Sequence, residues 1–316
     1  MIVKLATRSH VAEARRRAME EARRRSFSGD EAVRVANMAA ELATNLLEHA
    51  SGGELAIARF DDADGIGIEL LALDRGDGLA GIGTGLGAVM RLPDCLRVYS
   101  RPGLGTAVMA RFAAKVPQGE AARRGPQIGA VAAPYPGEEV CGDAWAVDSA
   151  DGGTLLVADG TGHGPLAARA AQAAIGILRR DAGQPLPRLL ETIHRALALT
   201  RGAAVAMARV DRAAGLVRFT GIGNISGTLA AGGRVHRMAS HNGTAGHVAR
   251  RITEFTYPYE GAPTLILHSD GLTTRWEIDA YPGLVQAHPS LIAGVLYRDH
   301  QRGRDDATVV VMKAAA

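Results

Sequence analysis

The stretch Thr154-Leu-Leu-Val-Ala-Asp-Gly-Thr-Gly-His-Gly164 contains an apolar run that ends at an aspartate and a glycine-rich turn. A short apolar run bounded by glycine predicts a buried β-strand over 154–158. Small and apolar residues then recur at helical spacing, so we expect a helix over 165–180. The Asp159 carboxylate would therefore lie at the end of a strand, where backbone and water can share a cation.

Further acidic residues occur in the same context, because Asp143, Asp270 and the pair Asp305-Asp306 each end or adjoin an apolar run. Aspartate before glycine is ordinary turn chemistry, so a single case is a weak signal. Several such carboxylates would repel one another unless a hard divalent cation, such as magnesium or manganese, neutralised them. Two such ions can activate a water for in-line attack on a phosphoryl group.

Strand patterns dominate the chain from residue 128 onward. The apolar runs predict strands over 144–147, 154–158, 204–210, 216–220, 264–268 and 308–312. Helical spacing predicts helices over 165–180, 186–199 and 289–298.

The four acidic sites occur in one order with the segments Gly223-Asn-Ile-Ser-Gly227, His241-Asn-Gly-Thr-Ala-Gly246 and Ser269-Asp-Gly271. This combination resembles the PPM family of metal-dependent serine/threonine phosphatases, in the SpoIIE-type branch that includes RsbX. The resemblance covers about 128–313. It implies an αββα sandwich with two central antiparallel sheets, and dephosphorylation of a signalling protein.

Carried over by position, the resemblance implies two Mn²⁺ or Mg²⁺ ions held by Asp143, Asp159, Asp270 and Asp305. The carbonyl of Gly160 would complete the set, and Asp306 is the alternative to Asp305. Asp159 and Asp270 would be catalytic through a metal-activated water.

One position departs from the family pattern. Many PPM enzymes carry histidine directly after the Asp-Gly pair as a general acid, whereas this chain has Thr161 there and His163 two residues later. His163 is either a loop residue in a glycine turn or a proton donor contributing about 10²–10⁴-fold in rate. The sequence leaves both interpretations open.

The first 115 residues read as a separate α/β domain. The patterns predict helices over 9–25 and 29–50, and strands over 2–6, 54–60, 66–73, 96–100 and 106–112. Residues 116–127 contain two prolines and two glycines without an apolar period, which is typical of a linker. The predicted division is therefore a domain over 1–115, a linker over 116–127 and a second domain over 128–316.

Four features of the first domain suggest a nucleotide site. Glu41 and Asn45 share one helix face. Asp74 can accept a proton from an adenine amino group, while glycine lets the backbone approach a ligand. A glycine-rich loop before a helix can cradle phosphate. The fourth feature is Gly103-Leu-Gly-Thr106, directly before the last predicted strand. The residues concerned are Glu41, Asn45, Asp74, Gly76, Gly78, Gly83, Gly85, Gly87 and Thr106.

These features, in this order, resemble the GHKL ATPase superfamily, specifically anti-sigma-factor kinases of the RsbT and RsbW type. The resemblance covers about 2–113 and implies a Bergerat-type two-layer α/β sandwich that binds ATP or ADP with Mg²⁺. Glu41 would be the kinase base, Asn45 the Mg²⁺ ligand, and Asp74 and Thr106 the adenine ligands. Only Leu79–Ile82 separate Gly78 from Gly83, so almost no lid is present, which favours nucleotide binding over kinase turnover.

Composition excludes several other classes. The net charge is +3. The arginine runs at 15–17 and 23–25 lie in a predicted helix that also contains Glu13, Glu20 and Glu21, as on a solvated helix face. The chain has no apolar stretch of ~18 residues and begins without a signal peptide. Its two cysteines have neither disulfide nor zinc spacing. We therefore expect a cytoplasmic protein that binds neither nucleic acid nor membrane.

Three functional hypotheses follow. The first is a phosphatase acting on a phosphorylated STAS-domain protein or anti-sigma-factor antagonist, with a regulatory or docking nucleotide-binding domain and a possible homodimer. The second is a bifunctional kinase and phosphatase. The third is a non-catalytic module for partner switching.

Overall fold

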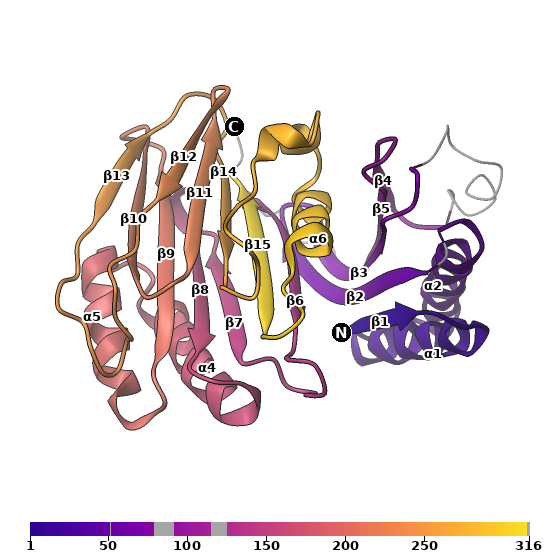
Figure 1. Cartoon of the computed structure of the whole chain (residues 1–316), viewed down its shortest axis with the longest axis horizontal. Helices are drawn as coiled ribbons and strands as arrows, with labels where there is room; N and C mark the ends of the chain where they lie inside the picture. Colours follow the sequence, from indigo (N-terminus) through magenta and orange to yellow (C-terminus); the bar gives the residue numbers. More distant parts are fainter. Residues whose placement is uncertain (51, 79–91, 115–124, 315–316) are drawn as a thin grey trace. The chain divides into compact units, whose positions relative to one another are not determined.

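The structure is a computed structural model that describes residues 1–50, 52–78, 92–114 and 125–314 (Figure 1). The chain forms two compact units. The first consists of Met1–Arg123 together with Ile278–Arg298, and the second of Arg124–Glu277 together with Asp299–Ala316. The sequence-based division, which kept 278–298 in the second domain, differs from these units at that segment.

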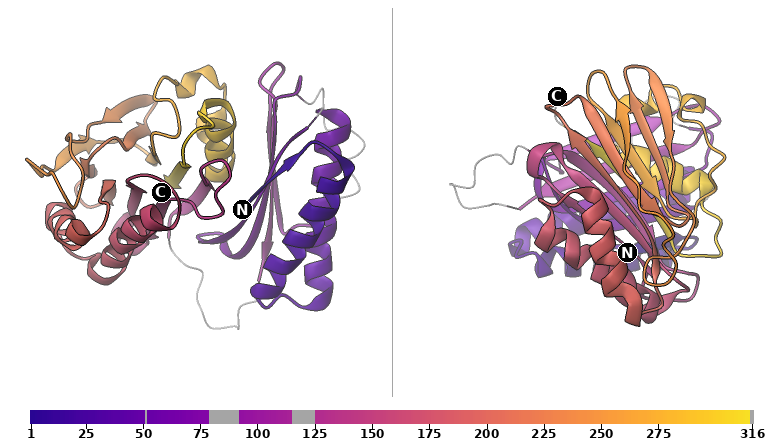
Figure 2. Two further views of the ribbon diagram at one scale, coloured as in Figure 1. Left: turned by 60° about the horizontal axis from the view of Figure 1, so that its bottom comes forward. Right: turned by 90° about the vertical axis from the view of Figure 1, so that its left-hand side faces the viewer.

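The first unit contains a five-stranded antiparallel sheet with two helices on one face (Figures 1 and 2). In sheet order the strands are β1 (Ile2–Leu5), β2 (Gly53–Asp62), β3 (Gly65–Asp74), β5 (Thr106–Ala113) and β4 (Cys95–Ser100). The helices are α1 (Arg8–Arg24) and α2 (Gly29–His49). These helices and the sheet form an antiparallel α/β arrangement; the two-layer Bergerat-type sandwich of the GHKL superfamily stays a prediction.

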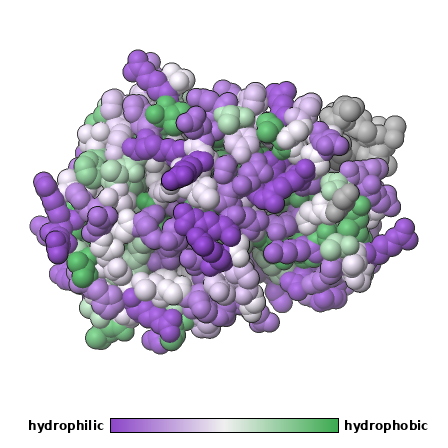
Figure 3. All heavy atoms as spheres, viewed as in Figure 1, coloured by the Kyte–Doolittle hydropathy of each residue, from purple (hydrophilic) through white to green (hydrophobic). Residues whose placement is uncertain are grey.

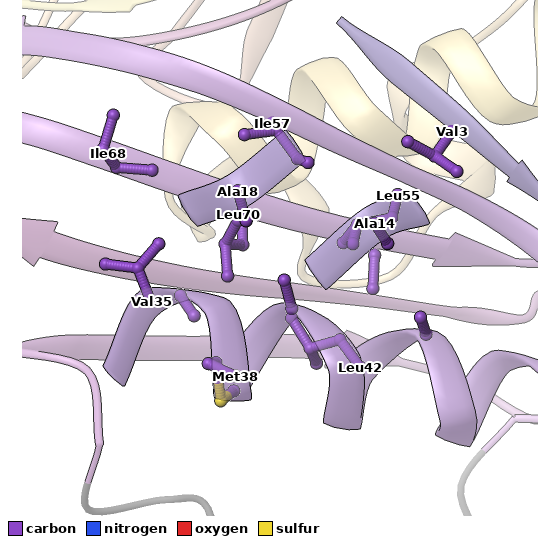
Figure 4. Close-up of a cluster of buried hydrophobic side chains, with 14 of the residues drawn as sticks. Val3, Ala14, Ala18, Val35, Met38, Leu42, Leu55, Ile57, Ile68 and Leu70 are labelled. Carbon is purple, nitrogen blue, oxygen red and sulfur yellow. The ribbon is translucent and has the colours of Figure 1, made fainter. Parts of the chain in front are cut away.

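Local signals account for the start and the orientation of α2. Ser28 caps the helix: its Oγ accepts from the Glu31 amide at 3.3 Å, and its amide donates to Glu31 Oε2 at 2.9 Å. Buried residues recur at helical spacing along α2 and form one apolar stripe. The stripe packs with α1 and the sheet in a single core, of which Figure 4 shows Val3, Ala14, Ala18, Val35, Met38, Leu42, Leu55, Ile57, Ile68 and Leu70.

The opposite face of this sheet is covered by helix α6 (Pro289–His300), which follows two 3-10 turns at Ile278–Ala280 and Leu284–Gln286. A Cβ built on Gly294 would lie 2.8 Å from Leu73 and 2.9 Å from Leu71, so the helix backbone approaches the sheet closely. The same face also carries a buried ionic cluster around Arg111, which is 2% exposed.

The second unit contains two five-stranded antiparallel sheets packed face to face. The first sheet has the order β13 (Phe255–Pro258), β10 (Leu216–Ile222), β9 (Ala203–Asp211), β8 (Thr154–Gly160) and β7 (Asp143–Asp148). The second has the order β12 (Arg234–Met238), β11 (Ser226–Ala231), β14 (Thr264–His268), β15 (Ala307–Lys313) and β6 (Gln127–Ala133).

Apolar side chains fill the space between these sheets. A second core joins the first sheet to α4 (Gly164–Asp181) and α5 (Leu186–Ala196), the two helices that lie beside it in Figure 1. The mixed α+β architecture with antiparallel sheets agrees with the expected PPM-type fold. Its topology also sets the position of the acidic residues. β14 and β15 are antiparallel neighbours, so the end of β14 and the beginning of β15 meet at one edge.

No helix within the described ranges combines the length and apolarity that crossing a membrane requires. The face shown in Figure 3 is mainly hydrophilic, and its hydrophobic residues form small, separate patches.

Candidate functional site

The β7–β8 hairpin brings the first two predicted ligands together. Asp143 begins β7 and Asp159 lies near the end of β8, and the two are direct partners in the antiparallel register. Directly opposite residues in such a ladder have Cβ atoms about 4.5–5.5 Å apart. Two carboxylates therefore face the same end of the hairpin, as the apolar run at 154–158 suggested.

The Asp143 carboxylate is buried and only partly satisfied. Ser269 Oγ donates to Asp143 Oδ2 at 2.7 Å, and that hydroxyl accepts from the Thr308 amide at 3.0 Å. Asp143 Oδ1 is buried and has no hydrogen-bond partner. A buried carboxylate oxygen without a donor is costly, so this atom requires an explanation such as a bound ion.

Asp306 shows the same feature. Its Oδ1 accepts from the Tyr135 amide at 2.8 Å, while its Oδ2 is buried without a partner. A Cβ at Gly142 would lie 2.6 Å from that oxygen, so the backbone leaves space beside it. The neighbouring Asp305 accepts from the Asp306 amide at 2.9 Å through Oδ1. Both members of the pair thus remain candidate ligands.

The remaining carboxylates meet in a pocket of about 620 Å³. Asp159, Asp270 and Asp305 line it, together with His163 and the side chain of Arg304. These aspartates come from three separate segments of the chain, and the structure brings them to one place. Asn224, which the sequence analysis quoted only as part of a motif, donates from Nδ2 to Asp270 Oδ2 at 2.8 Å.

The donor set fits divalent cations, because it consists of carboxylate oxygens, two of which are buried without donors. Within the described ranges, however, no group of three or more His, Cys, Asp or Glu side chains has the geometry to hold a metal ion. The predicted assignment of Asp143, Asp159, Gly160, Asp270, Asp305 and Asp306 as ligands therefore stays a proposal.

The electrostatics of the cluster also favour a cation. Burial raises the pKa of Asp159 to about 9, with further contributions from the charges of Asp143 and Asp270. Burial likewise raises the pKa of Asp143 to about 7, although the hydrogen bond from Ser269 opposes the rise. The pKa of Asp305 is raised mainly by burial as well. Without a positive charge nearby, ionising these three carboxyl groups together costs free energy.

This electrostatic cost predicts a pH-dependent effect of metal on stability. Between pH ~5 and ~8 the folded carboxyl groups retain protons that the unfolded chain, with carboxyl pKa values near ~4, has released. The free energy of unfolding of metal-free protein should therefore fall as pH rises, because the folded state binds more protons. Mn²⁺ should offset the loss, so the increase in Tm on adding Mn²⁺, measured by calorimetry, should be larger at pH 8 than at pH 5.5. An equal or smaller increase at pH 8 would contradict the proposed ligand set.

His163 is held in place at the mouth of this pocket. Its Nδ1 lies 2.9 Å from Glu138 Oε1, and its ring stacks on Tyr135 with centroids 4.3 Å apart and an interplanar angle of 17°. The imidazole is thus fixed by two neighbours. Sequence reasoning missed Glu138 and Tyr135, and the only available signal was their position in the loop just before Asp143.

Two residues of the predicted nucleotide site, Asp74 and Thr106, are in contact in the structure. Asp74 Oδ1 accepts from the amides of Gly76 at 2.8 Å and Thr106 at 3.2 Å. Thr106 Oγ1 lies 3.0 Å from Ser100 Oγ. Gly78 has φ +81°, and a Cβ there would lie 2.5 Å from the Arg101 carbonyl oxygen, so the loop requires glycine. Gly83, Gly85 and Gly87 lie outside the described residues.

Glu41 and Asn45 are half-buried on α2, as expected for one helix face. The structure shows no hydrogen bond from either side chain to Asp74 or Thr106 within the described ranges. Instead, the C-terminal end of α2 approaches the loop, since a Cβ at Gly76 would lie 3.5 Å from Ala50. Their predicted roles toward Mg²⁺ and phosphate stay predictions.

Comparison with known proteins bears on the second unit. The model of the family described as stage II sporulation protein E matches residues 150–315. A solved structure from work on the bacterial stressosome, described as a modular system adapted to control secondary messenger signalling, is 29% identical with a TM-score of 0.55. It covers 59% of this chain and 98% of that one. A comparison with curated proteins found no match.

Two further structures show the fold alone, because their identities are low. RsbX in complex with magnesium is 20% identical with a TM-score of 0.54, covering 64% of this chain and 99% of that one. The RsbU and RsbW domains of a Mycobacterium tuberculosis protein are 18% identical with a TM-score of 0.51, covering 61% and 62%. The fold expected for the C-terminal part is confirmed. The family match begins at residue 150, so it gives no support to the GHKL resemblance of residues 2–113.

Proposed function

The chain belongs to the family of stage II sporulation protein E, and from that premise we propose that it is a metal-dependent phosphatase that hydrolyses phosphoserine or phosphothreonine on a signalling protein. One observation carries the proposal: Asp159, Asp270 and Asp305 come from three separate segments and line one pocket. The nearby buried oxygens of Asp143 and Asp306, which lack donors, support a requirement for cations.

Asp143, Asp159, Asp270 and Asp305 or Asp306, with the Gly160 carbonyl, would hold two Mn²⁺ or Mg²⁺ ions. When bound, these ions would supply the Lewis acidity that activates water and neutralises the phosphoryl group. The carboxylates themselves orient the reacting groups. Asn224 restrains Asp270 by its hydrogen bond, and Ser269 restrains Asp143.

Two further side chains of the pocket suit phosphoester hydrolysis. Arg304 is exposed and is the one arginine among the described lining residues, so its guanidinium can pair with the phosphoryl oxygens. His163 can donate a proton to the leaving serine or threonine oxygen, and Glu138 would hold the ring in position. Of the two interpretations left open by the sequence, the contact with Glu138 favours the proton donor.

For the partner, we propose a phosphorylated STAS-domain protein or anti-sigma-factor antagonist in a partner-switching module. The support is the 29% identical structure from the bacterial stressosome. The open pocket, bordered by exposed Arg304 and half-exposed His163, can admit a phosphorylated side chain presented by a folded protein.

The proposed activity is tested by hydrolysis of p-nitrophenyl phosphate and of a phosphoserine peptide, with Mn²⁺, with Mg²⁺ and with excess chelator. We expect hydrolysis with metal, loss to the uncatalysed background with chelator, and recovery when Mn²⁺ is restored. Activity that persists in chelator would overturn the metal-dependent mechanism. No hydrolysis with either metal, by protein shown to be folded, would favour the non-catalytic partner-switching module instead.

A second activity, nucleotide binding by the first unit, is favoured by the loop at Asp74. Asp74 Oδ1 accepts hydrogen bonds from two backbone amides. Asp74 Oδ2 accepts none from the residues that the structure describes, so it can accept a hydrogen bond from an adenine amino group. Incubation with radiolabelled ATP and candidate STAS-domain proteins separates binding from kinase turnover. Label transfer dependent on Glu41 would establish the bifunctional alternative, and ATP binding without transfer would limit the unit to regulation or docking.

A further inference from the structure

Two segments of the second unit, 197–203 and 244–251, form part of the rim of the proposed phosphatase pocket. They are joined to each other by a pair of backbone hydrogen bonds. The Ala203 amide donates to the Ala245 carbonyl oxygen at 3.0 Å, and the Ala245 amide donates to the Ala203 carbonyl oxygen at 2.8 Å. The turn that leads into β9 and the loop that follows β12 therefore present one continuous surface.

Both segments are also bonded to the pocket itself. Thr161, which lines the pocket, donates from its amide to the Gly202 carbonyl oxygen at 3.0 Å. Thr244, another lining residue, exchanges two backbone hydrogen bonds with Val248, each of 2.9 Å. A folded protein that presents a phosphorylated side chain to this pocket therefore has to contact the rim.

The rim is rich in positive charge that the protein itself does not neutralise. The Arg201 side chain lies against the pocket wall, because a Cβ at Gly162 would lie 3.0 Å from Arg201 Nη1. Residues 197–203 and 239–253 contain neither aspartate nor glutamate. No carboxylate among the described residues forms an ion pair with any of the exposed arginines on the rim segments and on the segment that carries Arg304. These arginines are Arg201, Arg250, Arg251, Arg302 and Arg304.

The same region carries most of the exposed large hydrophobic side chains of the second unit. In the described part of that unit they are Val140, Leu166, Leu199, Val235 and Val248. Leu166 lies in the first turn of α4, three residues after the pocket-lining His163, and Leu199 and Val248 belong to the rim. Leu199 is 100% exposed, although backbone bonds hold the turn around it. Single exposed hydrophobic residues are common, but a group of them beside an opening is typical of a protein interaction site.

We propose that this rim is the docking surface for the phosphorylated substrate protein, whose own face combines acidic and apolar side chains around the phosphorylated serine or threonine. The inference rests on the proposed phosphatase function. Arg201 determines specificity by pairing with a carboxylate beside the phosphorylated residue, and Leu199 packs against an apolar side chain. These contacts lie away from the reacting atoms and bind substrate and transition state alike, so they act on KM rather than on kcat.

Three phosphoserine peptides of equal length, with neutral, acidic and basic flanking residues, test the charge. Steady-state kinetics of the full chain with Mn²⁺ give kcat and KM for each peptide. At low ionic strength the acidic peptide should have a KM about two- to fivefold below that of the neutral one, as expected for an exposed ion pair, and added salt should reduce the difference. In Arg201→Glu the acidic peptide should lose this advantage, and the basic peptide should gain relative to wild type.

Matched controls come from the same unit. Arg179 is exposed in the last turn of α4, at the opposite end of that helix from His163, so Arg179→Glu should keep the wild-type preference. Leu199→Ser should raise the KM of a peptide with leucine beside its acidic residues by about threefold. Val235→Ser, on the edge strand β12, should leave that KM unchanged.

Hydrolysis of p-nitrophenyl phosphate separates this inference from the phosphatase function, because that substrate has no flanking residues. If the wild-type protein hydrolyses it with Mn²⁺ but has equal KM values for the acidic and neutral peptides, the docking surface is overturned and the phosphatase stands. If it hydrolyses none of these substrates, both proposals are overturned. An undiminished preference for the acidic peptide in folded Arg201→Glu would overturn the role of Arg201. Should that variant not fold, the wild-type comparison still decides, since it needs no substitution.

Discussion

Replacing Asp159 with alanine is expected to lower kcat for Mn²⁺-dependent phosphoester hydrolysis by about 10³-fold or more. Asp159 is the cross-strand partner of Asp143 and lines the pocket together with Asp270 and Asp305, so its loss removes a carboxylate that adjoins both groups. A correctly held cation supplies several kcal/mol of transition-state stabilisation, and each ~1.4 kcal/mol corresponds to tenfold in rate. Steady-state kinetics with p-nitrophenyl phosphate at saturating Mn²⁺ would measure the loss.

Thermal stability distinguishes a lost ligand from a damaged fold. Asp159→Ala removes a half-buried carboxylate whose pKa is raised by burial and by its acidic neighbours. At pH 8 without metal, the variant should therefore be at least as stable as wild type, and its Tm should respond less to Mn²⁺. The matched control is Asp148→Ala, at the other end of the same hairpin and opposite Thr154, which should retain activity. A fully active Asp159→Ala enzyme would remove the basis of the proposed mechanism.

The strands that sequence reasoning located are those with continuous apolar runs. β8 and β14 are buried on both faces, so their side chains show no alternation but a clear hydrophobic run between turns. The strands it did not single out include β12 and β13, which lie at sheet edges and expose many of their side chains. Edge strands need only one apolar face, and in five or fewer residues that signal is too short to separate from a loop.

The candidate site was likewise predictable from the sequence only in part. The order of Asp143, Asp159, Asp270 and Asp305 is readable because the family resemblance relates positions far apart along the chain. The contact between Glu138 and His163 is not readable, since it depends on how one loop folds back over another. The position of α6 is hidden for a different reason: a helix buried on all sides indicates burial but not which surface covers it.

Replacing Arg111 with alanine is expected to destabilise the first unit by about 3–5 kcal/mol. Arg111 is 2% exposed and pairs with Asp62 at 2.9 Å and Glu69 at 2.6 Å, both buried, and with Asp64 at 2.9 Å. Burial alone would lower the pKa of Arg111, but Glu69 and Asp62 raise it, so the guanidinium stays charged. Its removal leaves buried carboxylates without their counter-charge, which costs far more than the pair contributes when intact.

The measurement is urea unfolding followed by amide exchange in peptides of β3 and β5, because two compact units need not unfold in one transition. Arg97→Ala is the matched control: this arginine lies on the adjacent strand β4, is exposed and, among the described residues, donates to the carbonyl oxygen of its neighbour Leu96. Its effect should stay within about 0.5 kcal/mol. Because Ser290 of α6 contacts the same Glu69 carboxylate, the loss of Arg111 should also increase exchange in α6. Destabilisation of β3 and β5 with α6 unchanged would mean that α6 is held by its apolar contacts alone.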